Sequence, residues 1–315
     1  MNRGKFLLAA VVMMALAIAS SQSLRAQQAP AGNGVPVQMI VTVEARHGSD
    51  VPDVTQKDVM VYEGHNRDQV TDWVPARAEH AQLELFVLID DSSGGSIGNQ
   101  LDELRKFMEE LPSSALVGVA YMQNGTAKVE QNLTNDHALA AKGLRLPLGM
   151  AGANASPYFS LSDLLKRWPQ TKSRREVLMV TDGIDRYYGS GDLNDPYLSS
   201  AIDAAQREGV LVSAIYNPSA GHFGHSYWQA YWGQMYLAEI ADRTGGEAYY
   251  IGMTGSPVSF SPYLRDLTNR TNHQYLLTFV AKAEKKGGLR SVKVRTEVSN
   301  AELVAADRVF VPAAQ

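Results

Sequence analysis

The stretch "LFVLIDDSSGGS", residues 85–96, decides the fold prediction. Its first five residues are apolar, which predicts a central strand covered on both faces. Two carboxylates, Asp90 and Asp91, follow at the carboxyl end of that strand, and hydroxyl and glycine residues come next. In open α/β sheets, ligands bind at this end of the strands. A simpler alternative is that one of these polar side chains only caps the following helix.

Beyond this stretch, the sequence alternates apolar strand patterns with amphipathic helix patterns. Buried strands are predicted at 115–122, 176–182 and 210–217, and residues 126–134 are predicted to pair with the first of these as a hairpin. Strands separated by helices predict a mostly parallel sheet. The fold class is therefore α/β, with a Rossmann-like sheet flanked by helices.

The two flanks of this region alternate apolar and polar residues, as half-buried strands do. Examples are "VQMIVTVEA" at 37–45 and "HQYLLTFVAKA" at 273–283. Because chain termini often lie close together, we expect the flanks to form one small all-β domain. The predicted segments are a signal peptide (1–26), an N-terminal β segment (27–80), the α/β domain (81–272) and a C-terminal β segment (273–315).

The first residues have the pattern of a secretory signal peptide. Arg3 and Lys5 precede an apolar run over 6–19, and small and polar residues follow it. The run of about 14 residues is short for a bilayer span, which leaves an uncleaved anchor as the weaker alternative. We therefore expect a secreted or periplasmic protein with no membrane span after cleavage.

The net charge of −4 does not indicate the basic surface that nucleic-acid binding needs.

Three separated stretches place oxygen-bearing side chains at the same predicted sheet edge. Asp90 and Ser92 follow the first strand, Ser156 precedes a helix, and Asp182 follows a third buried strand. Carboxylates and hydroxyls without His or Cys are ligands that Mg²⁺ or Ca²⁺ prefers. Mg²⁺ keeps several waters and needs only one or two protein carboxylates, so it suits this sparse set. The sequence therefore predicts a candidate Mg²⁺ site made of these four residues.

At these positions the chain resembles the von Willebrand factor A domain, whose metal-ion-dependent adhesion site reads Asp-x-Ser-x-Ser, a distant Thr and a distant Asp-Gly. Asp90, Ser92 and Asp182 match that pattern, and Ser156 stands where the family has Thr. Gly94 occupies the place of the second Ser, which removes one oxygen ligand and makes the site degenerate.

The α/β resemblance covers about residues 83–272, and the flanks, such as "KDVMVYEGHNRDQVTDW" at 57–73, look like the VWFA-related family of bacterial secreted proteins. The resemblance implies a non-catalytic binding or adhesion module. A protein partner would offer an Asp or Glu carboxylate to the metal ion. The alternative is a metal-independent scaffold or assembly protein with the same fold.

Two aromatic stretches, 186–197 and 218–236, are predicted to border the same edge and form a recognition rim. We assign partner binding to Asp91, Tyr187, Trp228 and Trp232. The alternative is that the aromatic residues at 228, 231 and 232 begin a helix and pack inward. His222 and His225 could pair on zinc, but no further ligands have suitable spacing.

Catalytic readings are weaker. Asp136 and His137 could join Ser156 in a hydrolase triad, but no G-x-S-x-G elbow exposes a nucleophile. The stretch "LIDDSS" is similar to phosphatases that use Asp-x-Asp, yet its second Asp lies at the wrong offset. We therefore predict that the protein is not an enzyme.

Overall fold

The computed structural model describes residues 34–92, 97–149, 152, 154–171, 173–188, 195–218 and 226–314. The predicted signal peptide and Gly94 lie outside these ranges. The large sheet, within the described residues, has the strand order β6 (Thr126–Thr134), β5 (Ala115–Gln123), β4 (Leu83–Asp90), β7 (Arg174–Thr181), β8 (Val210–Tyr216) and β9 (Ala248–Tyr249).

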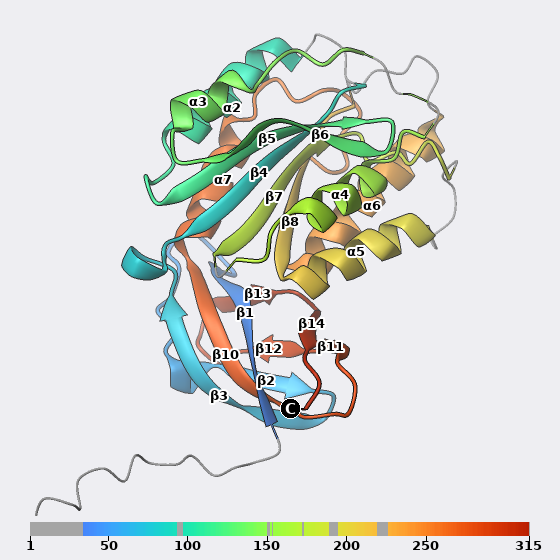
Figure 1. The fold of residues 1–315 in the computed structure, drawn as a ribbon. Helices are drawn as coiled ribbons and strands as arrows, with labels where there is room; N and C mark the ends of the chain where they lie inside the picture. Colours follow the sequence, from blue (N-terminus) through green and yellow to red (C-terminus); the bar gives the residue numbers. More distant parts are fainter. Residues whose placement is uncertain are drawn as a thin grey trace, which may run out of the picture. The chain divides into compact units, whose positions relative to one another are not determined.

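The large sheet is parallel except at one edge (Figure 1). β6 runs antiparallel to β5, as the predicted hairpin requires. Every residue of β4, β7 and β8 is buried, which is what strands covered on both faces need. The apolar runs in the sequence thus correspond to the centre of the sheet.

Six helices cover the two faces of the large sheet among the described residues. They are α2 (Gly98–Glu109), α3 (His137–Lys142), α4 (Pro157–Arg167), α5 (Pro196–Glu208), α6 (Tyr227–Thr244) and α7 (Ser261–Asn272). One apolar core joins the sheet to α4, α5 and α6, and a second joins the other face to α2, α3 and α7 (Figure 1). Each helix has one apolar stripe. Because these stripes are buried against the sheet, the helices form one layer on each of its faces.

A second, antiparallel sheet is built only from the two flanks. Its strand order is β12 (Lys293–Arg295), β2 (Met60–Glu63), β3 (Asn66–Pro75), β10 (Gln274–Lys282), β1 (Gly34–Ala45) and β13 (Ala301–Ala305), and β11 (Gly288–Ser291) pairs with β14 (Arg308–Val311) nearby. Short 3₁₀ turns lie at Gln56–Asp58 and Ala78–His80. Strands from the N-terminal and C-terminal flanks are interleaved in this sheet and share one apolar core. The predicted fold class, an α/β sheet with a small all-β domain formed by both flanks, is therefore confirmed.

A buried polar network joins the large sheet to the chain that enters the small one. Arg174 Nη2 donates to the Ala81 carbonyl at 3.2 Å, and the guanidinium also donates to Gln274. Gln274 Nε2 in turn donates to Glu176 Oε1 at 2.7 Å. Burial raises the pKa of Glu176, whereas Arg174 lowers it. The paired charges thus tie the start of β7 to the start of β10.

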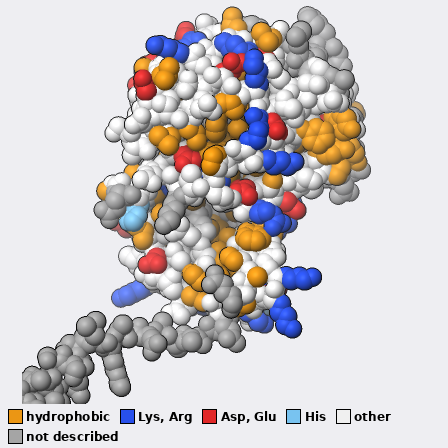
Figure 2. Space-filling view, viewed as in Figure 1, with side chains coloured by type: hydrophobic (Ala, Val, Ile, Leu, Met, Phe, Trp, Pro, Cys, Tyr) orange, Lys and Arg blue, Asp and Glu red, His pale blue; other side chains and the backbone are white. Residues whose placement is uncertain are grey.

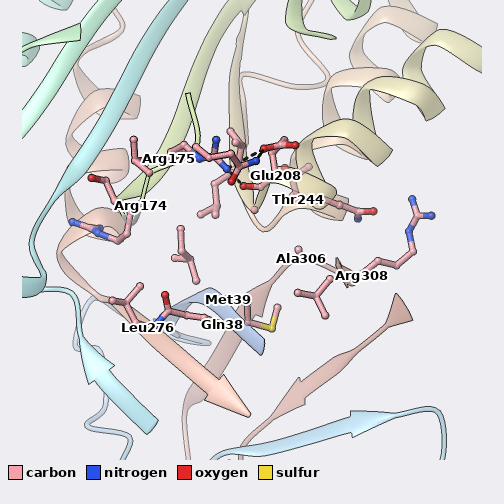
Figure 3. Close-up of a pocket in the computed structure, with 18 residues that line it drawn as sticks. Gln38, Met39, Arg174, Arg175, Glu208, Thr244, Leu276, Ala306 and Arg308 are labelled. Carbon is pink, nitrogen blue, oxygen red and sulfur yellow. Dashed lines mark hydrogen bonds and ion pairs between the residues drawn. The ribbon is translucent and has the colours of Figure 1, made fainter. Parts of the chain in front are cut away.

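A cavity of about 400 Å³ lies between the two sheets (Figure 3). Its arginines do not converge on one point: the side chains of Arg174 and Arg308 point in opposite directions. Arg175 pairs with Glu208 at 3.4 Å, and Arg308 pairs with Asp203. The first pair lies within the α/β domain and the second joins β14 to α5, so these arginines already have structural partners and we do not assign the cavity a ligand.

Candidate functional site

The candidate site lies where the order of the large sheet reverses direction. From β4 the chain moves to β5 and β6 on one side, and from β7 it moves to β8 and β9 on the other. The loops that follow the adjacent strands β4 and β7 therefore diverge and leave a crevice at their carboxyl ends. Asp90 ends β4 and Asp182 directly follows β7, so the two predicted carboxylates meet at this point.

Asp90 accepts hydrogen bonds on both carboxylate oxygens. Ser92 donates to Oδ1 from its backbone nitrogen at 2.9 Å and from its hydroxyl at 2.6 Å. The Thr181 hydroxyl donates to Oδ2 at 2.8 Å. All three side chains are buried. Asp90 thus turns the chain after β4 and links it to the end of β7.

Asp182 forms an ion pair with a residue that the sequence analysis missed. Arg186 Nη2 lies 2.6 Å from Asp182 Oδ2, and the backbone nitrogen of Ile184 donates to Oδ1 at 3.0 Å. Burial raises the pKa of Asp182 to about 7; Arg186 lowers this pKa and Asp90 raises it. A guanidinium therefore supplies positive charge beside the two carboxylates. The only sequence signal was an arginine four residues after Asp182.

Ser156 has a structural partner of its own. It is the N-cap of α4, where its hydroxyl oxygen accepts from the Phe159 backbone nitrogen at 3.3 Å. The same hydroxyl donates to Asp185 Oδ2 at 2.7 Å. Asp185, also missed from the sequence, accepts on Oδ1 from the backbone nitrogens of Tyr187 and Tyr188. Ser156 thereby fastens α4 to the loop after β7.

Asp91 points away from this crevice. The sequence places it among the partner-binding residues, but its side chain is buried. Arg145 binds it through both guanidinium nitrogens at 2.6 and 3.1 Å, and the Leu148 backbone nitrogen donates at 2.9 Å. Asp91, which directly follows β4, thus anchors the chain that follows α3.

The donor set as arranged does not fit a hydrated divalent ion. Asp90, Ser156 and Arg186 border a cavity of about 10 Å³, roughly the space of one water molecule. Mg²⁺ usually keeps several waters. Within the described ranges, no group of three or more His, Cys, Asp or Glu side chains could hold a metal ion. The Mg²⁺ site stays a prediction, and Gly94 lies outside the described residues.

The catalytic alternatives are not assembled by the fold. Asp136 caps α3, and His137 Nε2 lies 2.9 Å from the Ala115 carbonyl oxygen. α3 packs on the opposite face of the sheet from α4, which carries Ser156 at its start. The residues of the imagined triad are therefore held apart. His222 and His225, the imagined zinc pair, lie outside the described residues.

Helix α6 approaches the Asp182–Gly183 turn so closely that both contact positions require glycine. A Cβ at Gly233 would lie 2.3 Å from the Asp182 carbonyl oxygen, and one at Gly183 would lie 2.3 Å from the Gly233 carbonyl oxygen. Gly183 also has a φ of +70°, which L side chains rarely adopt. This contact places the start of α6 beside the crevice.

Aromatic side chains surround the crevice on two sides. Trp228 is 64% exposed, and Tyr227 and Tyr231 of the same helix are also exposed. Trp232 is half-buried and packs against Tyr231 with ring centroids 5.4 Å apart. Of the three residues 228, 231 and 232, only Trp232 therefore packs partly inward, as the alternative expected. Figure 2 shows hydrophobic side chains gathered at the right of the molecule, over the region of α6.

The second aromatic group is centred on the loop after β7. The exposed Tyr187 contacts Phe159 and Tyr197, with ring centroids 5.2 and 5.6 Å apart. The predicted rim residues Tyr187, Trp228 and Trp232 thus belong to two aromatic groups that flank the Asp182 turn. Whether they bind a partner stays a prediction.

Comparison with known proteins found only distant structural likenesses. No family model and no curated protein matches the chain. The matching solved structures include an aerotolerance-related membrane protein from Bacteroides fragilis NCTC 9343, 12% identical with a TM-score of 0.44, covering 60% of this chain and 98% of that chain. They also include the conserved hypothetical protein BatB from Bacteroides thetaiotaomicron, 13% identical with a TM-score of 0.42, covering 59% of this chain and 96% of that chain.

A third match is a von Willebrand factor type A structure from Catenulispora acidiphila, 12% identical with a TM-score of 0.43, covering 90% of this chain and 75% of that chain. With TM-scores below 0.5, these likenesses are too distant to assign a function. The α/β fold is established by the strand order of the sheet itself.

Gly233→Ala should lower the free energy of unfolding by roughly 1–3 kcal/mol, because the new methyl group overlaps the Asp182 carbonyl. Denaturant unfolding measures this. Gly98→Ala in α2 is the control, since its Cβ meets only a leucine methyl at 3.7 Å. That control should be neutral or stabilising by up to about 1 kcal/mol. Equal effects in the two variants would contradict the close contact.

The raised pKa of Asp182 should make the wild type lose stability with rising pH relative to Asp182→Asn. Between the ordinary value of 3.8 and about 7, folded Asp182 holds a proton that the unfolded chain has released. The free energy of unfolding therefore falls as pH rises through this window, by up to roughly 1.4 kcal/mol per pH unit. A wild type that gains stability over the window relative to the variant would refute this assignment.

Proposed function

We propose that the protein is an exported, non-catalytic binding module of the von Willebrand factor A type. It recognises a protein partner at the carboxyl edge of the large sheet, without a bound metal ion. The observation that carries this proposal is the ion pair between Arg186 and Asp182. It lies where the sequence resemblance implies a metal ion.

The charge arrangement supports a metal-free edge. Two buried carboxylates at the ends of adjacent strands are stabilised by a nearby positive charge. Arg186 supplies a permanent one, whereas a divalent ion must be acquired from solution. The Arg186 side chain is 15% exposed, so an Asp or Glu carboxylate of a partner can approach the guanidinium. The partner would still offer an Asp or Glu carboxylate, as the resemblance implies, but this carboxylate would bind the Arg186 guanidinium in place of a metal ion.

The aromatic side chains supply contact area around this charge. Tyr, Trp and Arg are the residue types that dominate binding energy at protein interfaces. Tyr187 and Trp228 are both exposed, on different elements that flank the Asp182 turn. A partner that covers the turn would bury both aromatic groups together. We propose that Trp228 contacts the partner directly and that the half-buried Trp232 supports it.

Export is part of the proposal and rests on the sequence pattern of residues 1–26. In the part of the chain that the structure describes, no helix is both long and apolar enough to cross a membrane.

A second candidate function is Mg²⁺-dependent adhesion through Asp90, Ser92, Ser156 and Asp182. The proximity of two buried carboxylates favours it, because Asp90 contributes to the raised pKa of Asp182. In that case Arg186 would have to leave Asp182 when the ion enters. The metal requirement of partner binding separates the two candidates. A scaffold that uses another surface is the remaining alternative.

A photo-cross-linking residue at position 228 should capture a protein partner in the cells that make the protein, equally in EDTA and in Mg²⁺. The matched control carries the same residue at position 139, because Leu139 is also exposed, at 41%, on α3 across the sheet. Capture at 228 alone, unchanged by EDTA, is the expected result. Capture abolished by EDTA would favour Mg²⁺-dependent adhesion, and equal capture at both positions would refute an edge-specific site.

A further inference from the structure

A groove of about 520 Å³ runs between the second half of α6 and the chain around β9. It is separate from the Asp182 turn, and its size is within the range of ligand-binding pockets. Its lining combines aromatic and apolar side chains with carboxylates: Trp232, Met235, Tyr236, Glu239, Asp242 and Glu247. No lysine or arginine is among the described residues that line it.

The groove carries excess negative charge. Glu239 and Glu247 each have a basic neighbour outside the lining, Arg243 at 3.4 Å and Arg270 at 3.0 Å. Arg270 also pairs with Glu44, so one cation serves two carboxylates. Asp242 is exposed and forms no ion pair among the described residues. The charges of the groove are therefore only partly balanced from within the chain.

Glu247 lies in an environment that disfavours its negative charge. Burial raises the pKa of Glu247; Arg270 lowers this pKa, but Asp266 and Asp242 raise it further. Glu247 and Glu239 nevertheless remain accessible, with side chains 42% and 39% exposed. A cation that enters the groove can therefore approach these carboxylates, which line it.

Aromatic side chains give the groove a second preference for cations. The half-buried Trp232 packs against the buried Tyr236, with ring centroids 6.2 Å apart, so Trp232 supplies the accessible ring, and Met235 beside it is exposed. A guanidinium over an aromatic face is attracted by the ring electrons, and carboxylates at the edge can bind its nitrogens. An apolar partner would instead bury the carboxylates without compensation.

We propose that this groove binds an arginine-bearing, basic segment of a protein partner. The inference adds a second contact to the binding module proposed above, and it rests on that function. The two contacts have opposite charge preferences: the Arg186 edge suits an acidic group, and the α6 groove suits a basic one. A partner with both would bind in one orientation along α6.

The test uses the purified protein and a fluorescein-labelled peptide, Gly-Arg-Leu-Arg-Gly, followed by fluorescence anisotropy. In the groove variant, Glu239→Gln with Asp242→Asn, the Kd should rise roughly tenfold. The control, Glu109→Gln with Glu110→Gln on α2, makes the same change in net charge away from the groove and should alter the Kd less than about twofold. A peptide with citrulline in place of both arginines has the same shape without the charge and should not bind.

Three results would overturn the groove proposal. They are no binding of the arginine peptide, equal weakening in the groove and control variants, or equal binding of the citrulline peptide. Trp232→Leu, which keeps an apolar side chain, should also weaken binding severalfold. The results for the two proposed sites can be told apart. Capture at position 228 with no peptide binding refutes only the groove proposal. Peptide binding without capture at position 228 refutes only the proposed partner site at the Arg186 edge.

Discussion

The burial of two carboxylates at the ends of adjacent strands constrains the whole carboxyl edge of the large sheet. Asp90 ends β4 and Asp182 follows β7. Because these two strands pair in parallel, their carboxyl ends, and therefore the two carboxylates, lie close together. Charges removed from water must be hydrogen-bonded or paired. Asp90 is satisfied by Ser92 and Thr181, and Asp182 by Arg186 and a backbone amide.

This arrangement also determines what surrounds the edge. Arg186 can stay beside Asp182 because the turn between them is held by α6, whose Gly233 allows direct backbone contact. The same helix then carries exposed aromatic side chains beside the turn and an acid-lined groove further along. The contact of Gly233 with the Asp182–Gly183 turn therefore fixes the position of α6, and with it the groove, relative to the Arg186 edge. The protein can present both as parts of one recognition surface.

Much of the fold could be predicted from the sequence, because buried strands and amphipathic helices leave strong periodic patterns. The central strands and the strands of both flanks followed from those patterns, whereas the pairing of the flanks in one β domain followed from the expectation that chain termini lie close together. The residues at 90 and 182 followed from their place at strand ends. The edge strand β9 leaves a weaker signal, because it spans only Ala248–Tyr249.

The partners of the site side chains could not be predicted in the same way. The direction of a long side chain such as Arg186 depends on packing that only the folded chain supplies. Asp185 receives one of its hydrogen bonds from Ser156, which is distant in sequence. Asp91 directly follows β4, and its partner Arg145 lies 54 residues away.

The claim that Arg186 takes the place of a metal ion is tested most directly by thermal unfolding after EDTA treatment, with and without Mg²⁺, Mn²⁺ or Ca²⁺. An ion at a hundred times its Kd would add roughly 2.7 kcal/mol of stability, which such an experiment resolves. The account predicts no rise in Tm with any of the ions. A rise in the wild type that Asp90→Ala lacks would contradict it and establish a working metal site.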